Sequence, residues 1–103
     1  MSQRIETLRS LIEQDPANSR VRYMLAMETA NSGDLATAAT VYEEVITRDP
    51  DYSAAYFHGG QTLEKLGRID EARSFYQRGI EATTRNGDSH TRSELQGALS
   101  MLG

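Results

Sequence analysis

Hydrophobic residues recur along this chain at the spacing of an α-helix, in short runs that polar residues, glycine and proline separate. In the first run, arginine and glutamate occupy one side, and the hydrophobic residues at helical spacing on the other side are Ile5, Leu8, Leu11 and Ile12. Pro16 prevents this helix from continuing. Each later run likewise places its hydrophobic residues at helical spacing. The pattern predicts six helices, at about residues 2–14, 19–31, 35–48, 53–66, 69–83 and 89–102.

The breaks between these runs carry residues that begin and end helices. Asn18 or Ser19 can accept hydrogen bonds from the free N–H groups at the start of the second helix. Gly33 and Gly67 can supply the left-handed residue that follows a helix. Because the connections are short, consecutive helices are expected to pair as antiparallel hairpins.

The two central hairpins nearly repeat one another at an offset of 34 residues. The coinciding pairs are Ser19 and Ser53, Gly33 and Gly67, Ala38 and Ala72, Tyr42 and Tyr76, and Ile46 and Ile80. A fixed period of this length is typical of stacked units that bury their apolar faces only against neighbours. We therefore expect an all-α solenoid. The last helix matches best at an offset of 36, which we attribute to a longer turn around Asn86, Gly87 and Asp88.

These residues resemble the tetratricopeptide repeat, a helix–turn–helix unit of 34 residues. The positions of its pattern are held by Leu25, Ala26, Thr29, Ala38, Tyr42 and Pro50, and then by Tyr56, Gly59, Gly60, Leu63, Ala72 and Tyr76. Arg22 replaces the first aromatic residue, Gly59 the leucine and Thr84 the second proline. The resemblance implies a right-handed stack of antiparallel hairpins with about six helices.

The resemblance covers nearly the whole chain, which we expect to form one domain over residues 1–103. Its parts are an orphan second helix at 1–16, repeats at 19–50 and 53–84, and an orphan first or capping helix at 88–103. Small residues are expected to let helix axes approach to ~8–10 Å. Gly59, Gly60 and Gly79 each weaken a helix interior by about 0.5–1 kcal/mol, so the second hairpin is expected to be the looser one.

The family takes up peptides or helices in a concave groove lined by the first helix of each repeat, and the resemblance implies such a groove here. Tyr23 and Phe57 are register-matched aromatic residues on those helices. The predicted groove residues are Arg20, Tyr23, Met27, Asn31, Phe57, His58, Gln61 and Lys65, to which the last helix would add His90, Ser93, Glu94 and Gly97. Alternatively, Tyr23, Met27 and Phe57 are packing between helices.

A well-known subfamily binds the C-terminal carboxylate of chaperones through lysines and asparagines in this groove. Here Tyr23, Met27 and His58 stand at the corresponding places, so we do not expect that ligand.

Charge and composition exclude several classes of partner. The chain of 103 residues has a formal net charge of −4, which argues against nucleic acid and anionic membranes as partners. It has no cysteine and therefore no disulfide or thiolate zinc site. The N-terminal residues 1–13 are interrupted by charges, and no stretch approaches ~18 apolar residues, so we expect a soluble, cytoplasmic protein.

No sequence motif for catalysis is present: we find no phosphate-binding glycine loop and no nucleophile motif. His58, Glu64, His90 and Glu94 could in principle converge on zinc, but such a site needs three or four ligands held by a second shell. We therefore expect no catalytic residues, no metal and no cofactor.

The sequence thus predicts a non-catalytic scaffold for protein–protein interaction, whose partner is an unidentified protein or peptide. Two alternatives remain. One is a homo-oligomerisation module that forms a homodimer through an end helix or the groove. The other is a metal-binding or enzymatic helical domain.

Overall fold

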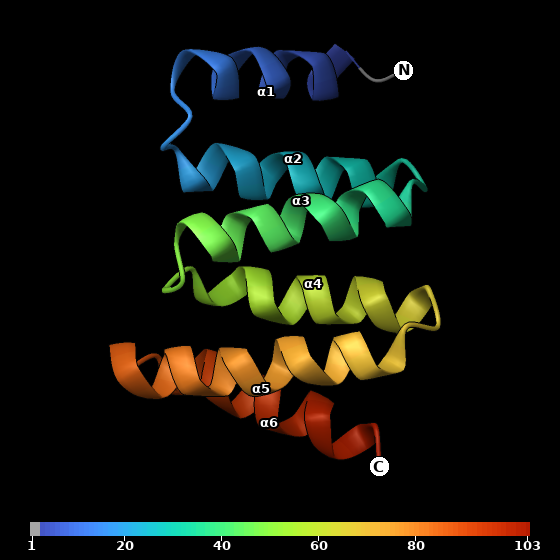
Figure 1. The fold of residues 1–103 in the computed structure, drawn as a ribbon, viewed down its shortest axis with the longest axis vertical. Helices are drawn as coiled ribbons and strands as arrows, with labels where there is room; N and C mark the ends of the chain where they lie inside the picture. The colour runs from blue at the N-terminus through green and yellow to red at the C-terminus, as the bar shows by residue number, and fades with distance from the viewer. Residues whose placement is uncertain (1–2) are drawn as a thin grey trace.

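The computed structural model describes residues 3–103, which form six α-helices and no strand. The helices are α1 (Gln3–Gln14), α2 (Ser19–Asn31), α3 (Leu35–Arg48), α4 (Ser53–Lys65), α5 (Ile69–Asn86) and α6 (Ser89–Met101). They stack as antiparallel rods along the longest axis of a molecule measuring 38 × 29 × 18 Å (Figure 1). The predicted all-α stack is confirmed. The expected first helical residue, Ser2, lies outside the described residues.

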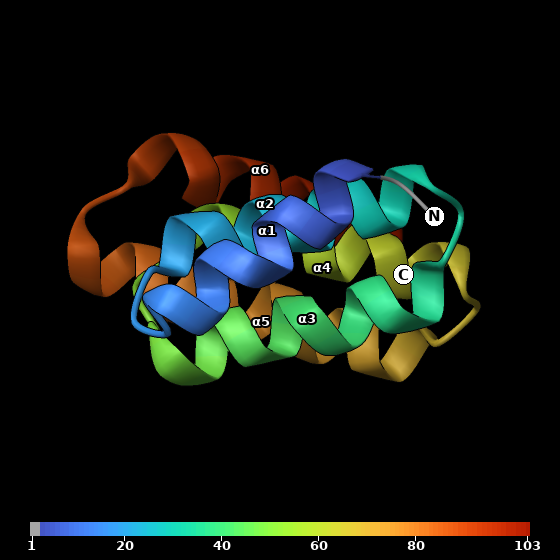
Figure 2. The same ribbon diagram turned by 90° about the horizontal axis from the view of Figure 1, so that it is seen from above.

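The helices after α1 form two layers, with α2, α4 and α6 on one side and α3 and α5 on the other (Figure 2). The backbone of α4 packs against both α2 and α6, whereas those of α3 and α5 do not pack against each other. We call α2, α4 and α6 the inner layer and α3 and α5 the outer layer. Within residues 3–103, no helix has the length and apolar content needed to cross a bilayer.

Local residues fix where the helices end. Gly33, Gly67 and Gly87 have φ values of +96°, +77° and +78°, which L-residues with a side chain rarely adopt. Each glycine follows a helix and reverses the chain, as predicted for the first two. At the start of α2, the Asn18 side chain accepts a hydrogen bond from the Val21 N–H at 3.1 Å, so Asn18 is the cap.

Helix α5 is longer than the sequence indicated. Its expected end was Thr83, followed by a long turn, but the helix continues to Asn86 and turns only at Gly87. With 18 residues against 14, α5 is four residues longer than α3, while the connection after it is two residues shorter. The 36-residue offset therefore comes from the longer helix and not from a longer turn, which corrects the prediction.

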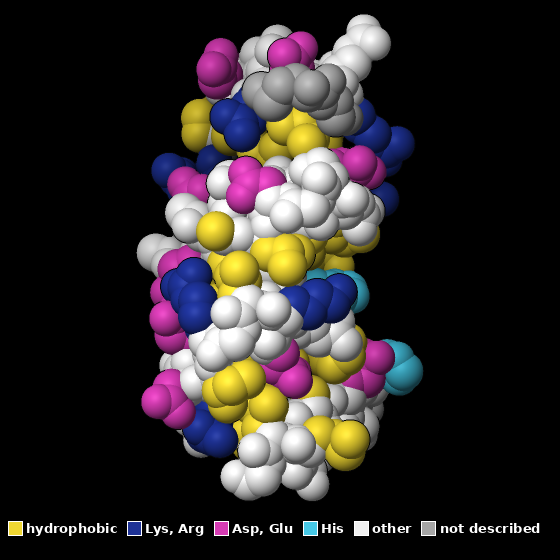
Figure 3. Space-filling view, turned by 90° about the vertical axis from the view of Figure 1, so that its right-hand side faces the viewer, with side chains coloured by type: hydrophobic (Ala, Val, Ile, Leu, Met, Phe, Trp, Pro, Cys, Tyr) yellow, Lys and Arg dark blue, Asp and Glu magenta, His cyan; other side chains and the backbone are white. Residues whose placement is uncertain are grey.

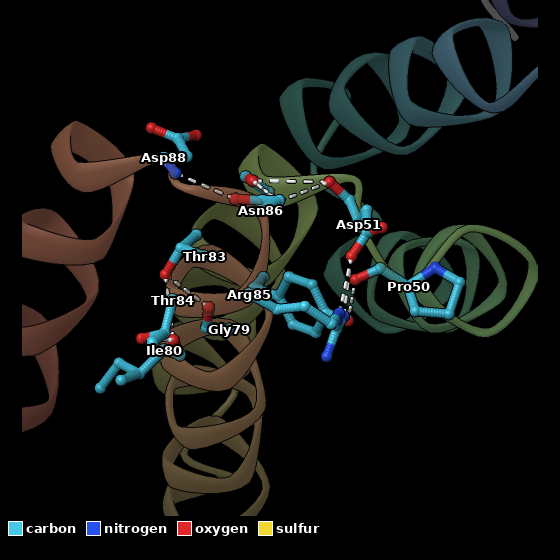
Figure 4. Close-up of polar contacts among 11 residues, drawn as sticks. Pro50, Asp51, Gly79, Ile80, Thr83, Thr84, Arg85, Asn86 and Asp88 are labelled. Atoms are coloured by element: carbon cyan, nitrogen blue, oxygen red, sulfur yellow. Dashed lines mark hydrogen bonds and ion pairs between the residues drawn. The ribbon is translucent and has the colours of Figure 1, made fainter.

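The added turn of α5 docks on the connection between α3 and α4 (Figure 4). Arg85 Nη2 lies 2.7 Å from Asp51 Oδ1, and Asn86 Nδ2 donates to the Asp51 carbonyl at 3.3 Å and to Ser53 Oγ at 3.1 Å. These contacts join residues more than thirty positions apart. They therefore stabilise the last turn of α5 in a way that the local signal of Gly87 does not show.

Glycines inside α4 and α5 lie where helices approach most closely. A Cβ atom on Gly79 would lie 2.6 Å from Cβ of Tyr56, and one on Gly60 would overlap the ring of the fully buried Tyr76. Gly59 lies under another aromatic ring of α5. The low helix propensity of these glycines is therefore accompanied by close packing, which opposes a looser second hairpin, and the looser second hairpin stays a prediction.

Arg22 has a structural equivalent in the next repeat. Only 5% of Arg22 is exposed, and its Nη1 donates to the Pro16 carbonyl at 2.8 Å. The Tyr56 hydroxyl donates to the Pro50 carbonyl at 2.6 Å, and both residues of this pair lie 34 positions later in the chain. The guanidinium thus makes the hydrogen bond that the phenol makes, which explains how the position tolerates an arginine.

We predict opposite effects for two glycine-to-alanine substitutions in helices. Gly60→Ala should lower the free energy of unfolding by about 1–3 kcal/mol, because the new methyl group collides with Tyr76. Gly97→Ala in α6 should raise it by about 0.5–1 kcal/mol, because its Cβ would meet no atom within 4 Å. Urea denaturation measures both, and equal shifts in the two variants would contradict the packing described for Gly60.

Candidate binding groove

The eight residues predicted for the groove all lie on α2 and α4 of the inner layer. Arg20, Met27, Asn31, Gln61 and Lys65 are exposed, and Tyr23, Phe57 and His58 are half-buried. Viewed from the side of the α2–α3 and α4–α5 turns, the histidine side chains gather at one edge of the molecule (Figure 3). The inner layer therefore presents a mixed polar and aromatic surface.

Aromatic rings join α2 to α4 across this surface. The Tyr23 ring centroid lies 5.1 Å from that of Tyr52 and 6.1 Å from that of Tyr42. Tyr23 Oη lies 2.6 Å from Nδ1 of His58, whose ring meets Phe57 edge-on at 5.5 Å. Tyr23 and Phe57 thus contribute to packing between helices while part of each side chain stays exposed.

A hollow of about 220 Å³ lies between α2 and α4; we call it the α2–α4 hollow. Lys65 is the charged residue on its wall, and exposed Met27 and Asn31 border it. The full lining is Met27, Ala30, Asn31, Tyr42, His58, Gln61, Thr62 and Lys65. Five of these lining residues, namely Met27, Asn31, His58, Gln61 and Lys65, belong to the predicted groove set.

A second hollow, of about 350 Å³, lies between α4 and α6; we call it the α4–α6 hollow. Its lining is Phe57, Gln61, Glu64, Tyr76, Ser93, Glu94, Gly97, Ala98 and Met101. Gln61 lines both hollows, which therefore lie next to each other on either side of α4, and we call the two together the groove. Ser93, Glu94 and Gly97 lie where the 36-residue register placed them. Met101 was missed, although it stands 36 positions after Lys65.

The titratable groups of the groove are partly removed from water. Burial lowers the pKa of His58, and the nearby carboxylate of Glu94 opposes this shift. Burial, reinforced by the carboxylate of Glu64, raises the pKa of Tyr76, whose hydroxyl donates a hydrogen bond to that carboxylate. The uncharged forms of His58 and Tyr76 are therefore favoured.

A third hollow, of about 400 Å³, lies between α3 and α5 in the outer layer and was not predicted. It is lined by Ala39, Thr40, Glu43, Glu44, Thr47, Arg48, Leu63, Arg68, Glu71 and Phe75. Ion pairs border it: Arg68 Nη2 lies 2.5 Å from Glu71 Oε2, and Arg78 Nη1 lies 3.4 Å from Glu43 Oε2. Because acids and bases alternate around it, its charge favours no class of ligand.

The four residues considered for zinc do not assemble. His90 Nε2 lies 3.8 Å from Glu94 Oε1, while Glu64 bonds to Tyr76. In the part of the chain that the structure describes, residues 3–103, no three histidine, aspartate or glutamate side chains come close enough to hold a metal ion.

Comparisons with known proteins agree with this architecture. The family model described as "Tetratricopeptide repeat" matches residues 23–87. A TPR repeat-containing protein of Pseudomonas aeruginosa is 25% identical over 91 residues, which cover 88% of this chain and 87% of that protein.

Solved structures of similar shape include a tetratricopeptide repeat domain protein of Salinibacter ruber. It is 35% identical with a TM-score of 0.77, and the match covers 82% of this chain and 94% of that one. The Yersinia enterocolitica type III secretion translocator chaperone SycD has a TM-score of 0.85 at 18% identity, covering 95% of this chain and 68% of that one. At that identity, the likeness to SycD shows the fold alone.

The lowered pKa of His58 predicts a loss of stability in mild acid. Below the ordinary value of 6.5, the unfolded chain takes up a proton that the folded chain resists. The contribution of His58 is therefore fully present above pH 6.5 and is lost as the pH falls below it. Urea denaturation between about pH 7.5 and 5.5 should show a smaller loss in His58→Gln than in the wild type.

The matched control is His90→Asn, which removes an exposed histidine on the same side of the molecule. It measures how much of the change in pH dependence comes from removing any histidine. If His58→Gln and the wild type lose stability equally over this range, His58 is not desolvated as described.

Proposed function

This chain belongs to the tetratricopeptide repeat family, and we propose that it is a non-catalytic scaffold that binds a segment of another protein in the groove across α4. The family generally mediates protein–protein interaction. The groove runs over the inner layer, the surface on which the family resemblance placed the contact residues. The proposed ligand is a peptide or a helix of the partner.

The position of the two hollows next to each other on the inner layer, with Gln61 on the wall of both, supports the proposal most directly. Together they are lined mainly by residues of α2, α4 and α6. Met27 and Met101 are exposed at its walls, the latter by 88%. Flexible thioethers next to rigid aromatic rings suit an apolar side chain from a partner.

The charges in the groove favour a different ligand from the chaperone C-terminus. Met27 and His58, which stand at places of the carboxylate clamp, line the α2–α4 hollow, and burial lowers the pKa of His58. Asn31 and Lys65 also line this hollow, but they do not stand at the clamp places that Tyr23, Met27 and His58 hold. The α4–α6 hollow carries Glu64 and Glu94. A carboxylate would therefore be repelled from half of the groove.

Self-association through the ends of the stack has less support. The outer helices carry Ala38 and Ala72, both fully buried, where a neighbouring helix packs, and Arg4 stands at the corresponding place of α1, 34 positions earlier. On α6, Gln96 stands 36 positions after Gly60, which lies under a tyrosine ring. Large polar side chains at these places oppose the close packing of a further helix.

We expect a ligand of the groove to depend on exposed residues of the inner layer. Peptides selected from a random library on the immobilised protein serve as probes, titrated into the ¹⁵N-labelled protein. Amide shifts should concentrate on α2, α4 and α6. The double substitution Met27→Ala and Gln61→Ala should weaken binding by about fivefold or more, because it removes contacts from both hollows.

The matched control is Thr40→Ala together with Gln77→Ala, two exposed residues of the outer layer. It should leave the affinity unchanged. Both double variants keep the half-buried Tyr23 and Phe57, so a loss of binding cannot come from disrupted packing. Shifts confined to α3 and α5, or weakening in the control alone, would refute the groove as the binding surface.

A further inference from the structure

Gly97 lies inside α6, where a glycine destabilises a helix relative to alanine. The glycines inside α4 and α5 allow close packing, but a Cβ atom on Gly97 would meet nothing within 4 Å. Its φ is not in the left-handed region, so the backbone does not require glycine either. Gly97 lines the α4–α6 hollow, and its missing side chain leaves room for an incoming group to reach the backbone of α6.

The charged side chains that line this hollow, Glu64 and Glu94, are both acidic. Glu94 keeps 44% of its side chain exposed, and its neighbour His90, 3.8 Å away, is a counter-charge only when protonated. Lys65 lines the adjacent α2–α4 hollow instead. A cationic group entering the α4–α6 hollow would therefore be attracted and an anionic group repelled.

Apart from Gln61 and Ser93, the rest of the wall is mostly apolar. Phe57 from α4 and Ala98 and Met101 from α6 line it, with the half-buried aromatic ring on one side and the exposed thioether on the other. A long side chain with a hydrocarbon stem and a charged head can cover such a wall while its head reaches a carboxylate. The planar, weakly hydrated guanidinium of arginine also stacks on aromatic rings, which the ammonium of lysine does less well.

We propose that the α4–α6 hollow receives an arginine side chain of the bound segment. Its methylene groups lie over Gly97 and Ala98, and its guanidinium lies by Phe57 and Glu94. The inference rests on the proposed function, because this hollow is half of the same groove. It adds the chemical class of the residue that the partner must present.

Four capped pentapeptides test this proposed arginine site, which we call the arginine seat. Each has one variable residue at its centre and alanine at the other four positions, and binding is followed by amide shifts in the ¹⁵N-labelled protein. The central residue is arginine, its uncharged analogue citrulline, leucine or glutamate. Arginine should shift the amides of Glu94 and Gly97 and bind about two- to fivefold more tightly than citrulline, as expected for a partly exposed ion pair. This advantage should shrink as salt is added, and glutamate should bind most weakly.

Two substitutions test separately how the charge of Glu94 and the open space beside Gly97 contribute to peptide binding. Glu94→Gln should abolish the preference for arginine over citrulline. Gly97→Leu should weaken every pentapeptide by filling the hollow, and its Cβ atom would meet no atom within 4 Å. The control Glu81→Gln, an exposed acid of α5 with the same change in net charge, should behave as the wild type.

The outcomes distinguish this inference from the proposed function. If citrulline binds as well as arginine, or if Gly97→Leu changes nothing, the arginine seat is refuted. If library-selected peptides shift the inner layer while the arginine pentapeptide does not, the groove stands and the arginine seat fails. If neither kind of peptide shifts the inner layer, both fail.

Discussion

The close approach of neighbouring helices at residues without bulk is the constraint on which the rest of the structure depends. Ala26, Ala38 and Ala72 have no exposed surface, and Gly60 lies directly beneath the ring of Tyr76. These contacts hold the inner and outer helices together. As a result, α4 packs against α2 and α6 in the inner layer, while α3 and α5 remain apart in the outer layer. The groove is thus a product of the packing that stabilises the fold.

The sequence predicted most helix ends because their causes are local. A glycine after a helix or an asparagine before one acts within a few residues, and these signals located the ends of α2, α3 and α4 to within a residue. The end of α5 also has a local signal in Gly87, but its last turn bonds in addition to Asp51 and Ser53, which precede it by more than thirty positions. Spacing alone could not show that these partners stabilise an extra helical turn.

The sequence predicted the helix face on which the groove lies, but it did not predict the shape of the groove. The repeat register placed Tyr23, Phe57 and His58 on one surface, yet the hydrogen bond that joins Tyr23 to His58 spans 35 positions and fixes how deeply both rings lie. No feature of the sequence indicated the hollow between α3 and α5, because its charged residues fit the pattern of an ordinary solvated helix face. The space beside Gly97 likewise depends on how far α6 lies from α4.

The equivalence of Arg22 and Tyr56 has a consequence for tracing the ancestry of such arrays. What the two residues share is a donor that reaches the carbonyl of a proline six positions upstream. Substitution scores treat arginine and tyrosine as unlike, so divergence at this place looks larger than it is physically. Duplicated repeats can therefore diverge in sequence while keeping the same hydrogen bond. Comparisons based on hydrogen-bond geometry would detect homology that sequence alignment misses.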